Sequence, residues 1–475
     1  MKKSVYEDGD EGVRLIVKRR GKDLPAQPAA PLREPVHVLY GGADRFTAET
    51  PAKLGKIALA TLDTYCRNFA EFADAMQLPG SGSLPTLTGA ATKLARSIRN
   101  EPERARTEDP AAWLAFSVFQ KVRAKLKSEP IEDFRIDFED GYGFRPDDDE
   151  NADAERAARE LAAAFLKKKA TAGCGFRVKS FGPATHRRAV RTLDLFLSAF
   201  IAETNGRIPP GFVVTLPKVA DRSEVKEICS RLKKFERKHN IAPGSIGLEL
   251  LIETPEAVID KKGSVAIRGF VEAAKGRCTS VHFGAYDYTS ALGIAAADQD
   301  IAHPACDMAR QMMLISLAPL GIRLSDSVTT EMPIPPHRQA PLDPLMESEN
   351  RKSVFGAWRR HFKNVRRSMS QGFFQSWDLH PNQLPARYAA VYHFYLGSFA
   401  ENAARLRGFV ERSTRATLTG NAFDDAASVR GLLNFFSRGI SCGAFSEAEA
   451  EAATGVSAAV IRSLDVSALG RVNTD

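Results

Sequence analysis

Two acidic residues in the middle of the chain each lie at the end of a β-rich segment. Glu253 ends the apolar run of segment 246–254, and Asp287 follows segment 279–285, one strand–helix unit further along. Carboxylates at neighbouring strand ends can share one hard cation, which is typically held by one or two carboxylates plus water and substrate oxygens. The spacing therefore suggests a Mg²⁺ (or Mn²⁺) site on Glu253 and Asp287. The alternative is that Asp287 caps the following helix, as aspartate often does.

A second group of charges lies in segment 134–140, which reads FRIDFED. Because side chains alternate between the two faces of a strand, Arg135, Asp137 and Glu139 share one face, directed to the interior of a barrel. Charges there are costly unless they are paired or bind a metal. We expect an internal salt bridge between Arg135 and Asp137, and we assign Glu139 and Asp140, at the strand end, to a catalytic site.

Three basic residues are candidate substrate ligands. Arg177 lies in segment 174–180, where its fork of donors could clamp a carboxylate or simply neutralise the acids of the preceding strand. Lys218, near the end of segment 212–219, could reach either the site or solvent. His380, at the end of segment 373–380, could line the site, although a single histidine is more often structural.

The elements that must position these residues alternate between short β-rich segments and helical stretches. This alternation is typical of a parallel sheet with crossover helices. Eight such units favour an α/β fold of the (β/α)₈ TIM-barrel type, whose active sites lie at the C-terminal ends of the strands; an open doubly wound sheet is the alternative. The eight predicted strands are 36–42, 134–140, 174–180, 212–219, 246–254, 279–285, 322–328 and 373–380.

The spacing of the strands also predicts the organisation of the chain. We expect a flexible N-terminal tail over 1–35, a barrel over 36–387 and a C-terminal helical extension over 388–475. Two strand–helix connections are long. The first contains a predicted helix over 53–76 and a second helix that begins after Asp109, and the other contains a proline-rich loop over 331–346 that we expect to close the site.

Composition restricts the class of partner. The 475 residues carry a formal net charge of +8, which suits anionic small molecules such as an oxo-acid or an acyl-CoA. The chain shows no zinc-finger or helix-turn-helix pattern, no apolar run long enough for a membrane helix and no cysteine pair with zinc spacing. We therefore expect a cytoplasmic homo-oligomer with no nucleic-acid or membrane partner and with reduced core cysteines.

Six short motifs occur in the order found in one enzyme superfamily. They are IDFED (136–140), FRV (176–178), PKV (217–219), IET (252–254), FGAYD (283–287) and HPNQ (380–383). Together they resemble the citrate lyase β-subunit/malyl-CoA lyase branch of the HpcH/HpaI aldolase superfamily. The first strand departs from the family pattern, because VLYGG (38–42) stands where the family usually has Phe-x-Pro-Gly.

The resemblance implies a Mg²⁺-dependent barrel enzyme. Glu253 and Asp287 would bind the metal, Arg177 would bind a substrate oxygen or carboxylate, and Glu139 and Asp140 would shape the water shell of the metal. Lys218 and His380, which lie in the remaining motifs, are expected to contact the substrate.

The reaction that we predict is a carbon–carbon lyase or aldolase reaction on a small 2-oxo or 2-hydroxy acid or its CoA thioester. It would pass through an enolate whose charge is stabilised by the metal and by Arg177. Glu139, Asp140 or a metal-bound water would move the proton. The alternatives are a phosphoryl-type enzyme acting on phosphoenolpyruvate or pyruvate with the same site, and a non-catalytic ligand-binding subunit.

Overall fold

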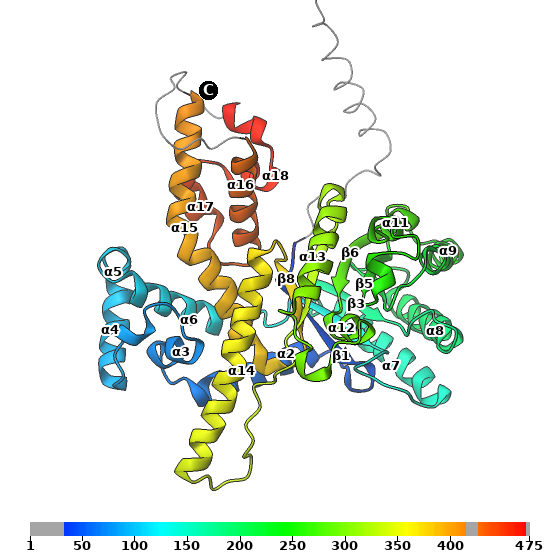
Figure 1. The fold of residues 1–475 in the computed structure, drawn as a ribbon, viewed down its shortest axis with the longest axis horizontal. Helices are drawn as coiled ribbons and strands as arrows, with labels where there is room; N and C mark the ends of the chain where they lie inside the picture. Colours follow the sequence, from blue (N-terminus) through cyan, green and yellow to red (C-terminus); the bar gives the residue numbers. More distant parts are fainter. Residues whose placement is uncertain (1–32, 415–425, 472–475) are drawn as a thin grey trace, which may run out of the picture.

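The chain folds into a closed barrel of eight parallel strands with a layer of helices beside it (Figure 1). The computed structural model describes residues 33–414 and 426–471. Each strand pairs with the next one in the sequence, and β8 pairs with β1, so the predicted (β/α)₈ barrel is confirmed. The strands are β1 (His37–Gly42), β2 (Asp133–Asp137), β3 (Gly173–Arg177), β4 (Val213–Leu216), β5 (Gly247–Ile252), β6 (Cys278–Phe283), β7 (Arg323–Val328) and β8 (Gln375–Asp378).

The helices that follow the middle strands cover the outside of the barrel through apolar stripes at helical spacing. In α8, for example, Leu193, Phe196, Leu197 and Phe200 are all buried. These helices are α7 (Asp147–Leu166), α8 (His186–Thr204), α9 (Arg222–Lys238), α10 (Pro255–Val258), α11 (Ile267–Ala273), α12 (Ala285–Ala291) and α13 (Pro304–Leu317).

The connection between β1 and β2 differs from its prediction in one respect. The helix expected over 53–76 is two helices, α2 (Thr50–Tyr65) and α3 (Phe69–Met76). The chain is extended at Cys66, and the Asn68 side chain accepts hydrogen bonds from the first backbone N–H groups of α3. Asparagine at this position starts a helix rather than continuing one, which explains the break.

The rest of this connection forms three further helices. They are α4 (Thr88–Asn100), α5 (Pro102–Glu108) and α6 (Pro110–Ser128). The side chain of Asp109 accepts a hydrogen bond from the N–H of Ala112 and caps α6, as predicted.

The C-terminal region is helical in its described parts and packs on this β1–β2 insertion. Helix α15 contacts both α6 and α14, so segments far apart in the sequence form one helical layer beside the barrel (Figure 1). Because α15 runs unbroken through residue 388, no change of structure marks the expected boundary there. Residues 1–32 of the expected N-terminal tail lie outside the described residues. The helices of this region are α14 (Pro344–Ser370), α15 (Leu384–Thr414), α16 (Ala426–Ser441), α17 (Glu447–Thr454) and α18 (Ala458–Ser463).

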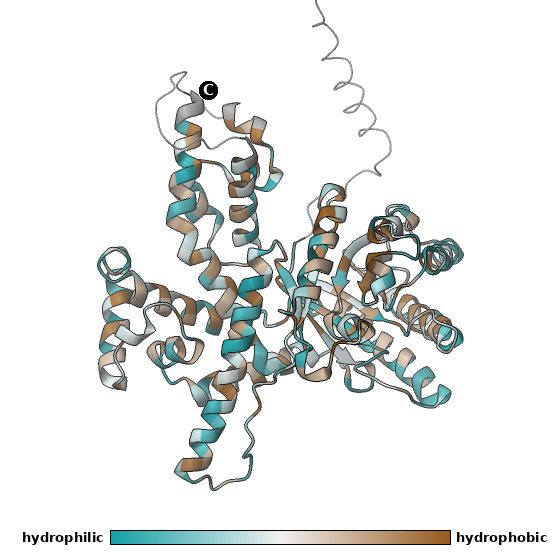
Figure 2. Ribbon diagram, viewed as in Figure 1, coloured by the Kyte–Doolittle hydropathy of each residue, from teal (hydrophilic) through white to brown (hydrophobic). Residues whose placement is uncertain are grey.

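The proline-rich loop after β7 runs along α14, which projects from the rest of the molecule (Figure 1). Ser353 and Asn350 of α14 hydrogen-bond to the loop backbone at Ile334 and His337. A groove of about 420 Å³ lies between Glu331 and Met332 and one face of α14. Figure 2 shows that most of the projecting part of α14 is hydrophilic. Closure of this loop over the site stays a prediction.

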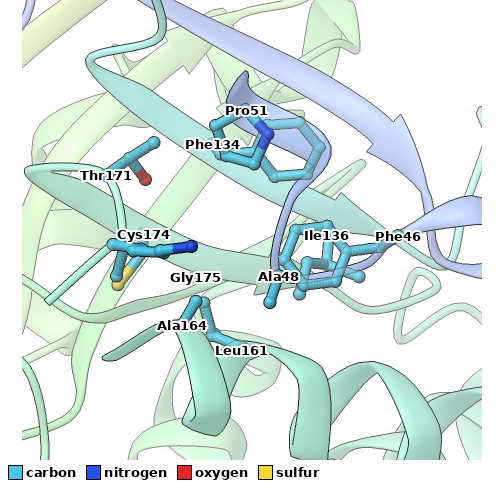
Figure 3. Close-up of a pocket in the computed structure, with 12 residues that line it drawn as sticks. Phe46, Ala48, Pro51, Phe134, Ile136, Leu161, Ala164, Thr171, Cys174 and Gly175 are labelled. Atoms are coloured by element: carbon cyan, nitrogen blue, oxygen red, sulfur yellow. The ribbon is translucent and has the colours of Figure 1, made fainter. Parts of the chain in front are cut away.

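An apolar hollow lies between the barrel wall and α7 (Figure 3). Its lining includes Phe46, Phe134, Ile136 and Cys174, and its volume of about 10 Å³ leaves room for roughly one water molecule. This hollow is too small to hold a substrate.

The cysteines and the helices can be compared with what the composition led us to expect, namely reduced core thiols and no membrane-spanning run. All six cysteines are free, and five of them are buried. Within residues 33–414 and 426–471, no helix combines the length and the apolar character needed to cross a bilayer.

Candidate metal and substrate site

Three carboxylates meet at the C-terminal ends of the strands. Asp140, Glu253 and Asp287 each offer one oxygen, and these oxygens all lie within 4.8 Å of one another. The structure thus brings together the two residues predicted to bind a metal. It adds Asp140, which the sequence assigned to the water shell, to the candidate ligands themselves. We call these three residues the carboxylate cluster.

Glu253 is the buried member of the carboxylate cluster. It follows β5 directly, is 2% exposed, and accepts a hydrogen bond from the backbone N–H of Lys218 at 2.9 Å. Gly284 makes room for it, because a Cβ atom at that position would lie 2.4 Å from Cγ of Glu253. The glycine of the FGAYD motif is therefore required by the close approach of a carboxylate from the neighbouring strand.

Asp287 enters the cluster from the first turn of α12, and its side chain is 44% exposed. The alternative that Asp287 caps this helix is wrong, because Gly284 is the N-cap residue. The carboxylate of Asp287 is therefore available to a ligand at the mouth of the barrel.

Arg177 lies at the base of the site and organises the acids around it. Its guanidinium contacts both oxygens of Asp137 at 2.6 Å, and its Nη1 lies 3.0 Å from Glu139 and 3.3 Å from Asp140. Asp137 and Arg177 are directly opposite each other in the pairing of β2 with β3. Of the two roles left open for Arg177, neutralisation of the β2 acids is thus present in the structure.

The expected salt bridge between Arg135 and Asp137 is wrong. Arg135 pairs instead with Asp133 of its own strand and, across the barrel, with Glu249 of β5 at 2.8 Å. Its Nε also donates to Glu249 at 3.0 Å. Asp137 instead pairs with Arg177, which lies directly opposite it on β3.

Two aromatic residues that the sequence analysis did not single out form the floor of the site. Tyr40 and Trp377 are stacked with ring centroids 4.5 Å apart, and the guanidinium carbon of Arg177 lies 4.9 Å and 5.9 Å from the centres of their rings. Such cation–π contacts stabilise a buried guanidinium. Alternation along β1 and β8 could have placed both side chains inside the barrel, but not against Arg177.

A buried polar network centred on His282 and Glu249 lies inside the barrel next to the rings of Tyr40 and Trp377. The hydroxyl of Tyr40 and the indole N–H of Trp377 both lie 3.1 Å from Nδ1 of His282. Nε2 of His282 lies 2.8 Å from Glu249, which also accepts a hydrogen bond from Ser280. The floor side chains are thus fixed by hydrogen bonds as well as by packing.

Lys218 reaches the site rather than the solvent. Its ammonium contacts Glu139 and lies 3.0 Å from Asp140 and 3.5 Å from Asp287. Its backbone has φ +51°, a left-handed conformation that is uncommon for lysine. Such strain often accompanies functional positions.

His380 is not brought into the carboxylate cluster by any contact of the described residues. Its Nδ1 accepts the backbone N–H of Asn382, and it caps the short helix η5 (Pro381–Gln383) in a capping box with Gln383. Burial, with Arg338 nearby, lowers the pKa of His380. The observed role of this histidine is to shape the turn after β8.

The site holds more negative than positive charge. Burial, opposed by the charges of Arg177 and Lys218 and reinforced by those of Glu139 and Asp287, raises the pKa of Glu253 to about 8. Burial and the nearby charge of Asp140, opposed by Arg177 and Lys218, raise the pKa of Glu139 to about 7. Burial acts to raise the pKa of Asp140 too, but Arg177 and Lys218 outweigh it and the pKa lies below its ordinary value.

The balance of positive and negative charge at the site shows whether a divalent metal fits there. In this part of the described chain two cations, Arg177 and Lys218, contact four carboxylates, those of Asp137, Glu139, Asp140 and Asp287, and the carboxylate of Glu253 accepts only the backbone N–H of Lys218. Oxygen donors with unbalanced negative charge are what a hard cation such as Mg²⁺ requires. The residues present fit a divalent metal.

A family model described as a domain of unknown function (DUF6986) matches residues 19–469. The chain belongs to this family. No curated protein matches the chain.

Among solved structures, the chain is similar to a citrate lyase from Burkholderia xenovorans, with 21% identity over 70% of this chain and 91% of that one, and a TM-score of 0.50. It is also similar to a Haloferax volcanii malate synthase in a magnesium/glyoxylate complex, with 15% identity over 68% and 76% of the two chains and a TM-score of 0.41. A third match is the CitE protein of Mycobacterium tuberculosis in complex with magnesium and acetate, with 17% identity over 59% and 93% and a TM-score of 0.35.

The match to the citrate lyase agrees with the barrel fold that the six motifs implied. At this identity the likeness establishes the fold, and the chemistry has to be argued from the site.

Proposed function

We propose that the protein is a divalent-metal-dependent enzyme that makes or breaks a carbon–carbon bond in a small 2-oxo or 2-hydroxy acid or its CoA thioester. The observation that carries the proposal is the meeting of three carboxylates, short of positive charge, at the catalytic end of a (β/α)₈ barrel. The order of the six motifs and the fold match to a citrate lyase support this class of reaction.

Asp140, Glu253 and Asp287 would hold the metal. A bound Mg²⁺ or Mn²⁺ would act as a Lewis acid on the oxygens of the substrate, which stabilises negative charge that develops there. Arg177, already fixed by Asp137 and by the aromatic floor, presents Nη1 toward the same space and would stabilise that charge from the side of β3.

Glu139 is the best candidate to move a proton. Its pKa of about 7 lies close to neutral pH, where a carboxyl group can both accept and donate a proton. Asp140, whose pKa is low, suits a metal ligand better. Lys218 would neutralise the carboxylate of the substrate beside them, whereas a substrate contact for His380 remains a prediction from its motif.

The first test is turnover of oxaloacetate, malyl-CoA and citramalyl-CoA by the full chain with and without a chelator. We expect activity on at least one of these substrates, its loss after thorough chelation, and its recovery with Mg²⁺ or Mn²⁺. Glu253→Gln should abolish the recovery, since it removes one ligand charge with little change in shape. Equal turnover before and after chelation would rule out the metal role.

A further inference from the structure

The ammonium of Lys218 and a divalent cation would bind the same carboxylate groups. Nζ of Lys218 lies 3.0 Å from Oδ1 of Asp140 and 3.5 Å from Oδ2 of Asp287, and these are two of the three candidate metal ligands. The third ligand, Glu253, accepts the backbone N–H of the same lysine. One residue therefore contacts the whole carboxylate cluster.

We propose that Lys218 is an internal counter-ion that exchanges with the metal. Its ammonium balances Asp140 and Asp287 until a divalent cation binds, and it then leaves these two acids and remains on Glu139. This inference rests on the proposed function only in that the metal occupies the carboxylate cluster.

The geometry allows the exchange. The hydrogen bond to Glu253 fixes the backbone of Lys218, while its side chain is 29% exposed and has four rotatable carbons with which to move. Glu139 is not one of the three candidate ligands, and its contact with Nζ can therefore persist. An ammonium beside a divalent ion repels it, so each would weaken the binding of the other.

The exchange would also prepare the site for its substrate. Released from Asp140 and Asp287, the ammonium would remain beside the metal on the Glu139 side, where a carboxylate of the substrate could replace the lost acids. A substrate anion would then bind more tightly to the metal-loaded protein than to the metal-free one, because the loaded protein offers it two cations.

The experiment measures Mn²⁺ binding by isothermal titration calorimetry to the full chain, without substrate. Lys218→Met keeps the length of the side chain, and Lys218→Asn introduces a residue that tolerates positive φ. Both variants should bind Mn²⁺ about tenfold more tightly than the unmodified protein, because the competing charge is gone. Lys226→Met, which removes an exposed lysine of α9, is the matched control and should leave the affinity unchanged.

A second readout serves if the Lys218 variants are only marginally stable. Saturating Mn²⁺ should then raise the melting temperature of Lys218→Met by more than it raises that of the unmodified protein, since the variant lacks its own counter-ion. An affinity equal to or weaker than that of the unmodified protein, or an equal or smaller thermal shift, would overturn the exchange.

Glu253→Gln separates this failure from that of the proposed function. If the unmodified protein binds Mn²⁺ and Glu253→Gln does not, but the Lys218 variants bind no more tightly, the exchange alone is wrong. If the unmodified protein and Glu253→Gln bind Mn²⁺ equally or not at all, both proposals fail.

Discussion

Two charged clusters lie at different places on the barrel, and they differ in how their carboxylates are balanced by positive charge and exposed to solvent. Behind β1 and β8, the carboxylate of Asp378 lies 2.7 Å from His37, 2.9 Å from His361 and 2.9 Å from Arg387, and all four side chains are at most 1% exposed. At the mouth, the carboxylate cluster combines one buried acid with two partly exposed ones. The first cluster is closed to solvent, whereas the second is open to it.

The pKa values of Asp378 and Glu253 differ because the two carboxylates are surrounded by different amounts of positive charge. Burial alone would raise the pKa of Asp378, but Arg387 and the two histidines hold it well below its usual range. Glu253 is equally buried, yet its pKa rises to about 8 because the positive charge around it is insufficient. A saturated buried carboxylate stabilises the fold, whereas an unsaturated one is a candidate functional group.

The largest effect should come from breaking the saturated cluster. Asp378→Asn leaves Arg387 buried without its counter-ion, and we expect a loss of about 3 to 5 kcal/mol in the free energy of unfolding. Asp140→Asn is the matched comparison, and its stability should change by less than about 1 kcal/mol because that side chain is partly exposed. Urea unfolding of both variants measures the difference, and similar losses would contradict the contrast between the clusters.

Neutralising Glu253 should stabilise the metal-free protein, whereas neutralising Asp378 should destabilise it. Its pKa rises from 4.5 to about 8 on folding, so the folded protein retains a proton that the unfolded chain has released between these pH values. Stability should therefore fall as pH rises through this window. At pH 8, the metal-free Glu253→Gln protein should be more stable than the unmodified one by about 1 to 3 kcal/mol, and at pH 4.5 the two should be alike.

Thermal unfolding of both proteins at these two pH values, with chelator present, measures this effect. The same substitution should weaken Mn²⁺ binding by about a hundredfold, since it removes a ligand rather than an outer-shell partner. A destabilised Glu253→Gln protein at pH 8 would place Glu253 with Asp378 among the structural carboxylates.

Metal affinity should depend on pH in the direction set by the same groups. Protonated Glu253 and Glu139, with pKa values of about 8 and about 7, oppose a cation at the mouth. The Mn²⁺ affinity should rise with pH by up to about tenfold per unit below pH 8, then level off. Titration calorimetry in buffers of different ionisation enthalpy should show proton release on binding, and an affinity independent of pH between 6 and 8 would contradict the raised pKa values.

The smallest effect should come from His380. If it only caps η5, His380→Ala should cost about 1 kcal/mol of stability and leave metal affinity and KM unchanged. Thermal unfolding measures the capping role of His380, and steady-state kinetics tests whether His380 also contacts the substrate. A rise of tenfold or more in KM would instead support the substrate contact that its motif predicts.

The strands were predictable because their signal is local. Each predicted segment either contains an observed strand, as 212–219 contains Val213–Leu216, or misses only the first residue of the strand, as 134–140 does for Asp133–Asp137. Alternating side chains and the helix between each pair of strands specify both the elements and their order. The break at Asn68 was missed because its capping role depends on one residue within a long apolar pattern.

The charge pairings were not predictable in the same way. Alternation correctly put Arg135 and Asp137 on the inner face of β2, but not which partner each would choose. That choice depends on strand register, which sets Arg177 opposite Asp137, and on the width of the barrel, which lets Arg135 reach Glu249. The floor of Tyr40 and Trp377 was missed for the same reason, since it joins the first strand to the last.

The sequence by itself determined that eight strands alternate with helices and that acids stand at the C-terminal ends of several strands, because both follow from periodicity along the chain. Only the tertiary structure decided that Asp140 joins Glu253 and Asp287, and that Lys218 lies among them. Closure of the barrel brings side chains from β2, β4, β5 and β6 to one point, and the balance of charge there depends on distances that no local pattern encodes.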